Sequence, residues 1–142
     1  MKWLMIAALV LVAIVIVATI IGAMLPRNHR ASRTASFKRP PPDVWAAVIE
    51  ATSKSNVPVD VLESAPPRRL VTRVKESEKM FGGTWTIAID PAADGSTVTI
   101  TEEGWVANPI FRFISRFVIG HHATMDSILR QMAKKLDAPA GV

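Results

Sequence analysis

The chain has 142 residues, a formal net charge of +5 and no cysteine. This length allows one domain plus one additional segment, and the lack of cysteine excludes disulfides, thiol catalysis and Cys-based zinc sites. Lysine and arginine are spread along the chain without a dense run, so no nucleic-acid partner is expected. The positive balance indicates either an ordinary solvated surface or, beside a membrane, attraction to acidic headgroups.

The N-terminal segment is almost wholly apolar. From Trp3 to Leu25 the chain has 23 consecutive uncharged residues, of which only Thr19 is polar. A helix of that length extends about 35 Å, enough to cross a hydrocarbon core of about 30 Å. It is longer than the apolar core of about 7–15 residues in a cleaved signal peptide. Residues 3–25 are therefore predicted to span the lipid bilayer as an uncleaved anchor.

Charges beside this segment favour a cytoplasmic position for the rest of the chain. The α-amino group and Lys2 precede the segment, whereas Arg27, Arg30 and Arg33 follow it. The positive-inside rule places the more basic flank in the cytoplasm, here by a margin of one charge. The predicted organisation is a transmembrane anchor at 1–26, a folded domain at 27–137 and a disordered tail at 138–142.

Strand and helix patterns then alternate along the chain. Residues 29–39 alternate apolar and polar side chains, which predicts a first strand. The run Pro40–Pro42 ends it, and a helix is expected from Asp43 through Thr52, where apolar residues recur at helical spacing. Further strands are predicted at residues 57–63, 69–76, 83–90 and 97–106.

The last two predicted strands alternate most clearly. Trp85 and Ile87 lie on one side of their strand, and Thr84 and Thr86 lie on the other. The turn at residues 91–95 predicts that the two strands form an antiparallel hairpin. Because only one side is apolar, one face of the sheet is expected to be covered.

A long C-terminal helix is the predicted cover. Asn108 and Pro109 form a helix start, and one helix is expected from there to near Asp137. Its apolar stripe repeats every three or four residues and consists of Ile110, Ile114, Phe117, His121, Met125, Ile128 and Met132.

In this order of elements the chain resembles the SRPBCC superfamily, also called START-like or polyketide cyclase/dehydrase-like proteins, and most of all its membrane-anchored bacterial subset. The resemblance implies an α+β helix-grip fold, in which a curved antiparallel sheet, here of five or six strands, wraps around a long C-terminal helix. The connection between Thr52 and Val59 is shorter than in full-length relatives, which implies a smaller or more open cavity. The resemblance rests on Phe37, Pro41–Trp45, Pro67–Arg73, Phe81–Trp85, Thr99–Gly104 and Asn108–Pro109.

The helix-grip fold implies a cavity between sheet and C-terminal helix, and several residues are candidates to line it. Glu102 shares its strand parity with Ile100, so its carboxylate is a candidate to orient a ligand or act as a general base; a position at the strand end, near solvent or paired with an arginine, is the alternative. His121 and His122 point about 100° apart on a helix, so no metal site is expected. The predicted ligand-binding set is Trp85, Ile87, Ile100, Glu102, Phe113, Phe117 and His121.

Three functions are compatible with these patterns. The first is a membrane-anchored domain that binds a hydrophobic or amphipathic small molecule, lipids included, without a cofactor. The second is a cyclase- or hydrolase-type enzyme that uses Glu102 and His121 in the same cavity. The third is a non-catalytic membrane interaction protein with a filled core. The sequence lacks the motifs of common catalytic sites, which favours a binding protein over an enzyme.

Overall fold

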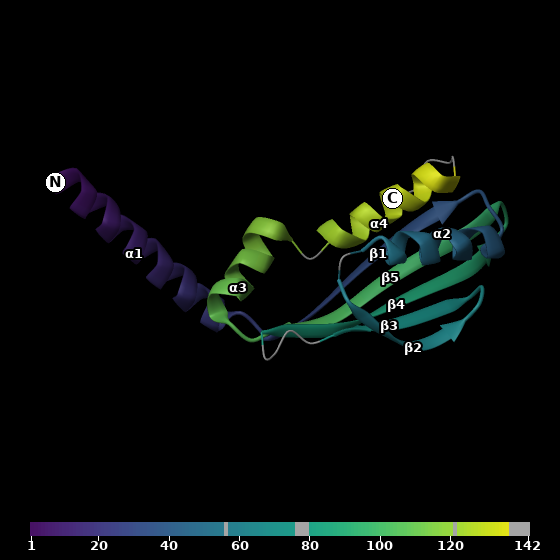
Figure 1. Ribbon diagram of the computed structural model, residues 1–142, viewed down its shortest axis with the longest axis horizontal. Coiled ribbons are helices and arrows are strands. Elements are labelled where there is room, and N and C mark those ends of the chain that lie inside the picture. The colour runs from purple at the N-terminus through teal and green to yellow at the C-terminus, as the bar shows by residue number, and fades with distance from the viewer. Residues whose placement is uncertain (56, 76–79, 121, 137–142) are drawn as a thin grey trace.

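The computed structural model describes residues 1–55, 57–75, 80–120 and 122–136, and its first element is a long apolar helix. Helix α1 (Lys2–Met24) is long and apolar enough to cross a membrane, and its apolar window is not buried against the rest of the chain. It projects away from the α+β domain (Figure 1). The structure therefore contains the apolar helix that the sequence predicts.

A five-stranded antiparallel sheet forms the centre of the domain, in the order β1-β5-β4-β3-β2. This agrees with the predicted α+β class and antiparallel sheet. The predicted hairpin is also confirmed, since Ala92 pairs with Gly95 across its turn. The strands are β1 (Asn28–Phe37), β2 (Val59–Ala65), β3 (Arg69–Val74), β4 (Phe81–Ala92) and β5 (Gly95–Val106).

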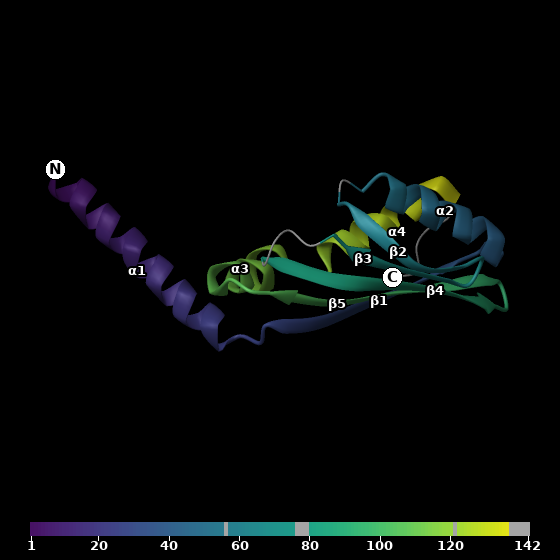
Figure 2. The ribbon, with the colours of Figure 1, turned by 60° about the horizontal axis from the view of Figure 1, so that its bottom comes forward.

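The two faces of the sheet differ as the alternation predicts. On the outer face, hydroxyl groups line up across β1 and β5: Ser32 lies 3.3 Å from Thr101, and Thr34 lies 3.3 Å from Thr99. The inner face is covered by α2 (Pro41–Ser53) and α4 (Ala123–Leu136), which lie on the same side of the sheet (Figure 2).

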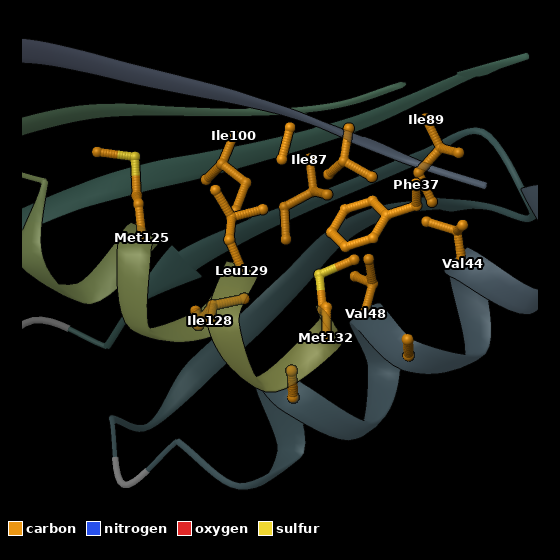
Figure 3. Close-up of a cluster of buried hydrophobic side chains, with 14 of the residues drawn as sticks. Phe37, Val44, Val48, Ile87, Ile89, Ile100, Met125, Ile128, Leu129 and Met132 are labelled. Carbon is orange, nitrogen blue, oxygen red and sulfur yellow. The ribbon is translucent and has the colours of Figure 1, made fainter. Parts of the chain in front are cut away.

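The core fills the space between these helices and the end of the sheet distant from α1. Side chains from four strands interdigitate with both helices, and each burial removes apolar surface from water (Figure 3). An ion pair between Arg33 and Asp126, 3.1 Å apart though not aligned for a hydrogen bond, joins β1 to α4. The largest fully buried side chains are Val44, Val48, Ile87, Ile89, Val98, Ile100, Met125, Leu129 and Met132.

The prediction of one continuous C-terminal helix is wrong. The segment begins as α3 (Pro109–Ile114), widens into a π-helical turn, η1 (Ser115–Ile119), and then breaks before α4. Gly120 adopts φ 79° and ψ 147°, outside the helical region and at a positive φ that only glycine adopts readily. The break lets α3 leave the sheet and pack on α1, while α4 stays on the core.

Two residues bind α3 to the end of α1. Gly22 is buried, and a Cβ atom added there would overlap the backbone carbonyl of Pro109. The guanidinium of Arg112 donates to the carbonyl oxygens of Gly22 and Leu25 at 3.4 and 3.3 Å. It also donates to Val106 and Ala107 at 2.8 and 2.7 Å, so one side chain joins α1, α3 and the end of β5.

Candidate functional site

An apolar cavity of about 470 Å³ lies over the inner face of the sheet near α1, where α4 no longer covers it. Its floor includes Trp85 on β4 and Thr72 on β3, which are paired neighbours in the sheet. Ile114 and Ile119 of the α3–η1 segment form one side, and Ile128 of α4 borders another. The cavity therefore lies between the sheet and both parts of the broken C-terminal segment.

The helix break leaves this space open, and two glycines in its wall let β4 pack closely on β5. Gly82 and Gly83 stand in the cavity wall, where they leave the sheet without side chains. A Cβ at Gly83 would lie 2.7 Å from the Cα of Gly104 on β5, so the two strands approach closely here. The divergence of α3 from α4 at Gly120 removes the side chains that a continuous helix would place over this part of the sheet.

One polar pair lies in the cavity wall. Nε2 of His29 on β1 is 2.7 Å from Oε1 of Glu102 on β5, and the two side chains are 17% and 19% exposed. Gly104 makes this possible, because a Cβ there would lie 2.8 Å from the imidazole Cε1. The pair gives a mainly apolar cavity one place where a polar group of a ligand could be oriented.

The predicted ligand-binding residues divide into separate groups. Trp85 and Glu102 line the cavity and are cross-strand neighbours on its floor. Ile87 and Ile100 instead lie in the packed core, because α4 covers that part of the sheet. The sequence pattern correctly predicted that Ile87 and Ile100 lie on the inner face of the sheet. It did not predict how far along the strands α4 covers that face.

Phe113 and Phe117 also lie away from the cavity wall. Their rings contact each other, with centroids 5.1 Å apart, and Phe117 is 61% exposed. The same segment presents Ile114, the last residue of α3, and Ile119, the last residue of the π-helical turn, to the cavity instead. His121 lies outside the described residues, as do the tail at 138–142 and the predicted element ends at Glu76 and Asp137.

His29 is the functional candidate that sequence reasoning missed. Its strand was predicted, and it shares the inner face with Ala31 and Phe37, so the pattern could have placed it on the covered side. The pattern does not reveal that β1 pairs with β5, and it is this pairing that places the imidazole of His29 beside Glu102. Among the described residues, no group of three or more His, Asp or Glu side chains is arranged to hold a metal ion.

Comparison with solved structures shows that the fold is shared. The chain is similar to an uncharacterized protein from Rhizobium leguminosarum, with a TM-score of 0.58 at 10% identity over 78% of this chain and 95% of the other. It is similar to protein MLL2253 from Mesorhizobium loti, with a TM-score of 0.55 at 14% identity over 77% and 94%. It is also similar to a protein from Rhodobacter sphaeroides, with a TM-score of 0.55 at 15% identity over 76% of this chain and 92% of the other.

No protein-family model matches the chain, and no curated protein matches it either. At the identities above, the structural likeness demonstrates a common architecture.

Proposed function

We propose that this protein is a membrane-anchored helix-grip protein of the SRPBCC, or START-like, superfamily that binds a hydrophobic or amphipathic small molecule, lipids included. The observation that carries the proposal is the cavity between the sheet and the C-terminal segment. Its volume of about 470 Å³ lies within the usual range of ligand pockets, about 300–1,000 Å³.

The chemistry of the cavity supports an apolar ligand with a polar end. Aliphatic and aromatic side chains from the strands β2 to β5, from α4 and from the α3–η1 segment supply most of the wall, and burial of apolar ligand surface against them is favourable. The contact between His29 and Glu102 supplies the polar position.

Two features support retention of α1 as an anchor. Its apolar surface is exposed along its length, which is stable in lipid and unfavourable in water. Its last turn is also bound by Arg112 and packs closely on Pro109, so removal of α1 would strip partners from the domain. The flanking charges support a cytoplasmic domain.

The test is to purify the full-length protein from its native membrane in a mild detergent, extract it with organic solvent and identify retained molecules by mass spectrometry. We expect one class of apolar or amphipathic molecule that is absent from an unrelated single-pass protein purified alongside. Intact mass and alkaline extraction of membranes check the anchor, and protease digestion of inverted and right-side-out vesicles checks the side. A preparation without any retained molecule, or a mature chain that lacks α1, would count against the proposal.

A hydrolase- or cyclase-type enzyme is the second candidate, and the His29–Glu102 pair is the observation that favours it. A carboxylate that contacts an imidazole can act in general acid–base catalysis when both groups reach a bound substrate. An enzyme would convert the molecule that the wild-type protein retains, and Glu102→Gln would abolish that conversion while the molecule still binds. Retention without turnover in the wild-type protein would exclude this candidate for that ligand.

A further inference from the structure

A second cavity, of about 460 Å³, lies where α1 meets the domain. Its wall begins at Leu25, directly after the end of α1, and continues through the start of β1. The opposite wall comes from Val106 and Ser115. We call this cavity the arginine groove, because Arg27, Arg30, Arg112 and Arg116 all line it.

Most of this positive charge is not neutralised by the protein. Arg30 is 3.6 Å from Glu103, and both side chains are well exposed. Arg27 lies over the ring of Trp105, 5.0 Å from its centroid, and Arg112 donates to carbonyl oxygens only. Within the part of the chain that the structure describes, Arg27, Arg112 and Arg116 form no ion pair, and no carboxylate lines the groove.

The surroundings of the groove suit the boundary between lipid and water. The groove adjoins the end of α1, where a spanning helix reaches the headgroups. On the neighbouring η1 turn, Phe117, Val118 and Ile119 are 61%, 71% and 63% exposed. Apolar side chains beside arginines on one short segment are typical of helices that lie in the membrane interface.

We infer that the arginine groove binds the phosphate group of an anionic phospholipid. Arg27 and Arg116 supply donors to the phosphate oxygens, and Arg112, held by four carbonyls, adds a fixed positive charge. His29 and Ser115 line both this groove and the apolar cavity, so a lipid headgroup bound here has that cavity directly beside it. The inference rests on the proposed membrane anchoring but not on occupancy of the apolar cavity.

The test compares two double variants of the full-length protein in nanodiscs made of phosphatidylcholine alone or of an equimolar mixture with phosphatidylglycerol. Arg27→Ala with Arg116→Ala removes two groove charges. Lys38→Ala with Arg68→Ala removes the same charge at the far end of the sheet; Lys38 follows β1, whose ten residues extend about 30 Å from its start. The readout is the number and type of lipids retained in native mass spectrometry.

We expect the wild-type protein and the distal variant to retain phosphatidylglycerol over phosphatidylcholine, and the groove variant to lose this preference by about tenfold or more. The inference would be overturned if the groove variant preferred phosphatidylglycerol as strongly as the distal variant does. It would also be overturned if the wild-type protein showed no preference for phosphatidylglycerol. If glycerol phosphate displaced the retained lipid at comparable concentrations, the phosphate source would be a soluble molecule and the lipid assignment would be wrong.

These outcomes are distinguishable from failure of the proposed function. If intact mass showed a chain that lacks α1, both the anchoring and the lipid source would be wrong. If an anchored chain showed no lipid preference, only the groove assignment would be wrong. A preference for phosphatidylglycerol with an empty apolar cavity would support the inference while it counts against the proposed small-molecule ligand.

Discussion

Nε2 of His29 and Oε1 of Glu102 lie 2.7 Å apart on neighbouring strands, although 73 positions separate them in the chain. Both side chains are mostly buried at the cavity wall, so the contact replaces water that each group has lost. A partly buried contact of this kind is expected to stabilise the junction of β1 and β5 and to orient any polar group that enters the cavity.

Replacement of Glu102 by leucine tests this contact. We expect Glu102→Leu to lower the free energy of unfolding by about 1–2 kcal/mol, because the mostly buried imidazole loses its carboxylate partner. Glu103→Leu is the matched control: Glu103 faces outward, and its 3.6 Å ion pair with Arg30 is exposed, so about 0.5 kcal/mol or less is expected. Denaturant titration of both full-length variants in the same detergent measures the difference, and equal losses would show that the contact adds no stability.

A larger side chain at Thr72 should fill the apolar cavity. Thr72 lies on the cavity floor opposite Trp85, and phenylalanine is well accepted in strands. We expect Thr72→Phe to reduce the amount of retained small molecule at least about tenfold, because its ring occupies the volume that the ligand needs. Mass spectrometry of solvent extracts gives the measurement.

Thr86→Phe provides the control for this change. Thr86 shares β4 with Trp85 but shares its face with Thr84, so its side chain points away from the cavity. The control should retain the molecule at the wild-type level. Equal loss in the two variants would mean that the molecule is not bound over Thr72.

A side chain at Gly22 should separate α1 from α3. Even one added carbon would overlap the carbonyl oxygen of Pro109, and Gly22→Val adds more volume without changing the apolar character of α1. We expect faster cleavage by proteinase K in the segment between α1 and β1, whereas Ala23→Val, on the exposed side of α1, should leave cleavage unchanged. If both variants were as resistant as the wild type, the close packing of Gly22 on Pro109 would be dispensable.

Loss of the Arg112 side chain should loosen the same junction by a different route. Arg112→Met keeps much of the aliphatic stem but removes donors to Val106, Ala107 and the end of α1. A loss of about 2 kcal/mol, typical for hydrogen bonds from a charged group, would increase the open fraction and the cleavage rate about 30-fold.

Two further variants serve as controls. Arg116→Met removes one positive charge from the neighbouring turn, so it shows the effect of charge loss alone. Arg112→Lys keeps the charge at position 112 but removes the planar guanidinium. Lysine retains the charge but lacks the planar fork that reaches several carbonyls, so it should behave like Arg112→Met rather than the wild type. Full protection by lysine would show that charge alone holds the junction.

Local patterns predicted the parts of the fold that depend on nearby residues. The turn around Ala92 and Gly95 and the alternation around Trp85 each act over a few positions, and each appears in the structure as expected. The helix expected from Asp43 is also present, but it begins two residues earlier, at Pro41, because proline is well accepted in the first turn of a helix. The parity of Glu102 with Ile100 likewise placed its carboxylate on the covered face.

The features that were missed depend on contacts between distant segments. The apolar stripe from Ile110 to Met132 continues in helical register across Gly120, so periodicity gave no sign of the break. The helix divides at Gly120, and α3 then packs on α1, a contact between distant segments that periodicity within one segment does not encode. The partner of Glu102 required the register between β1 and β5 for the same reason.

The hydrogen bonds of the Arg112 side chain restrict how far the domain can move relative to α1. Met24 ends α1 and Asn28 begins β1, and the guanidinium joins the end of α1 to the end of β5, the strand that pairs with β1, so the domain is not suspended on a loose tether. With α1 inserted in a bilayer, the cavity would remain at a set height and tilt above the surface. A hydrophobic molecule dissolved in that bilayer would then reach the protein by lateral diffusion in two dimensions, without first escaping into water.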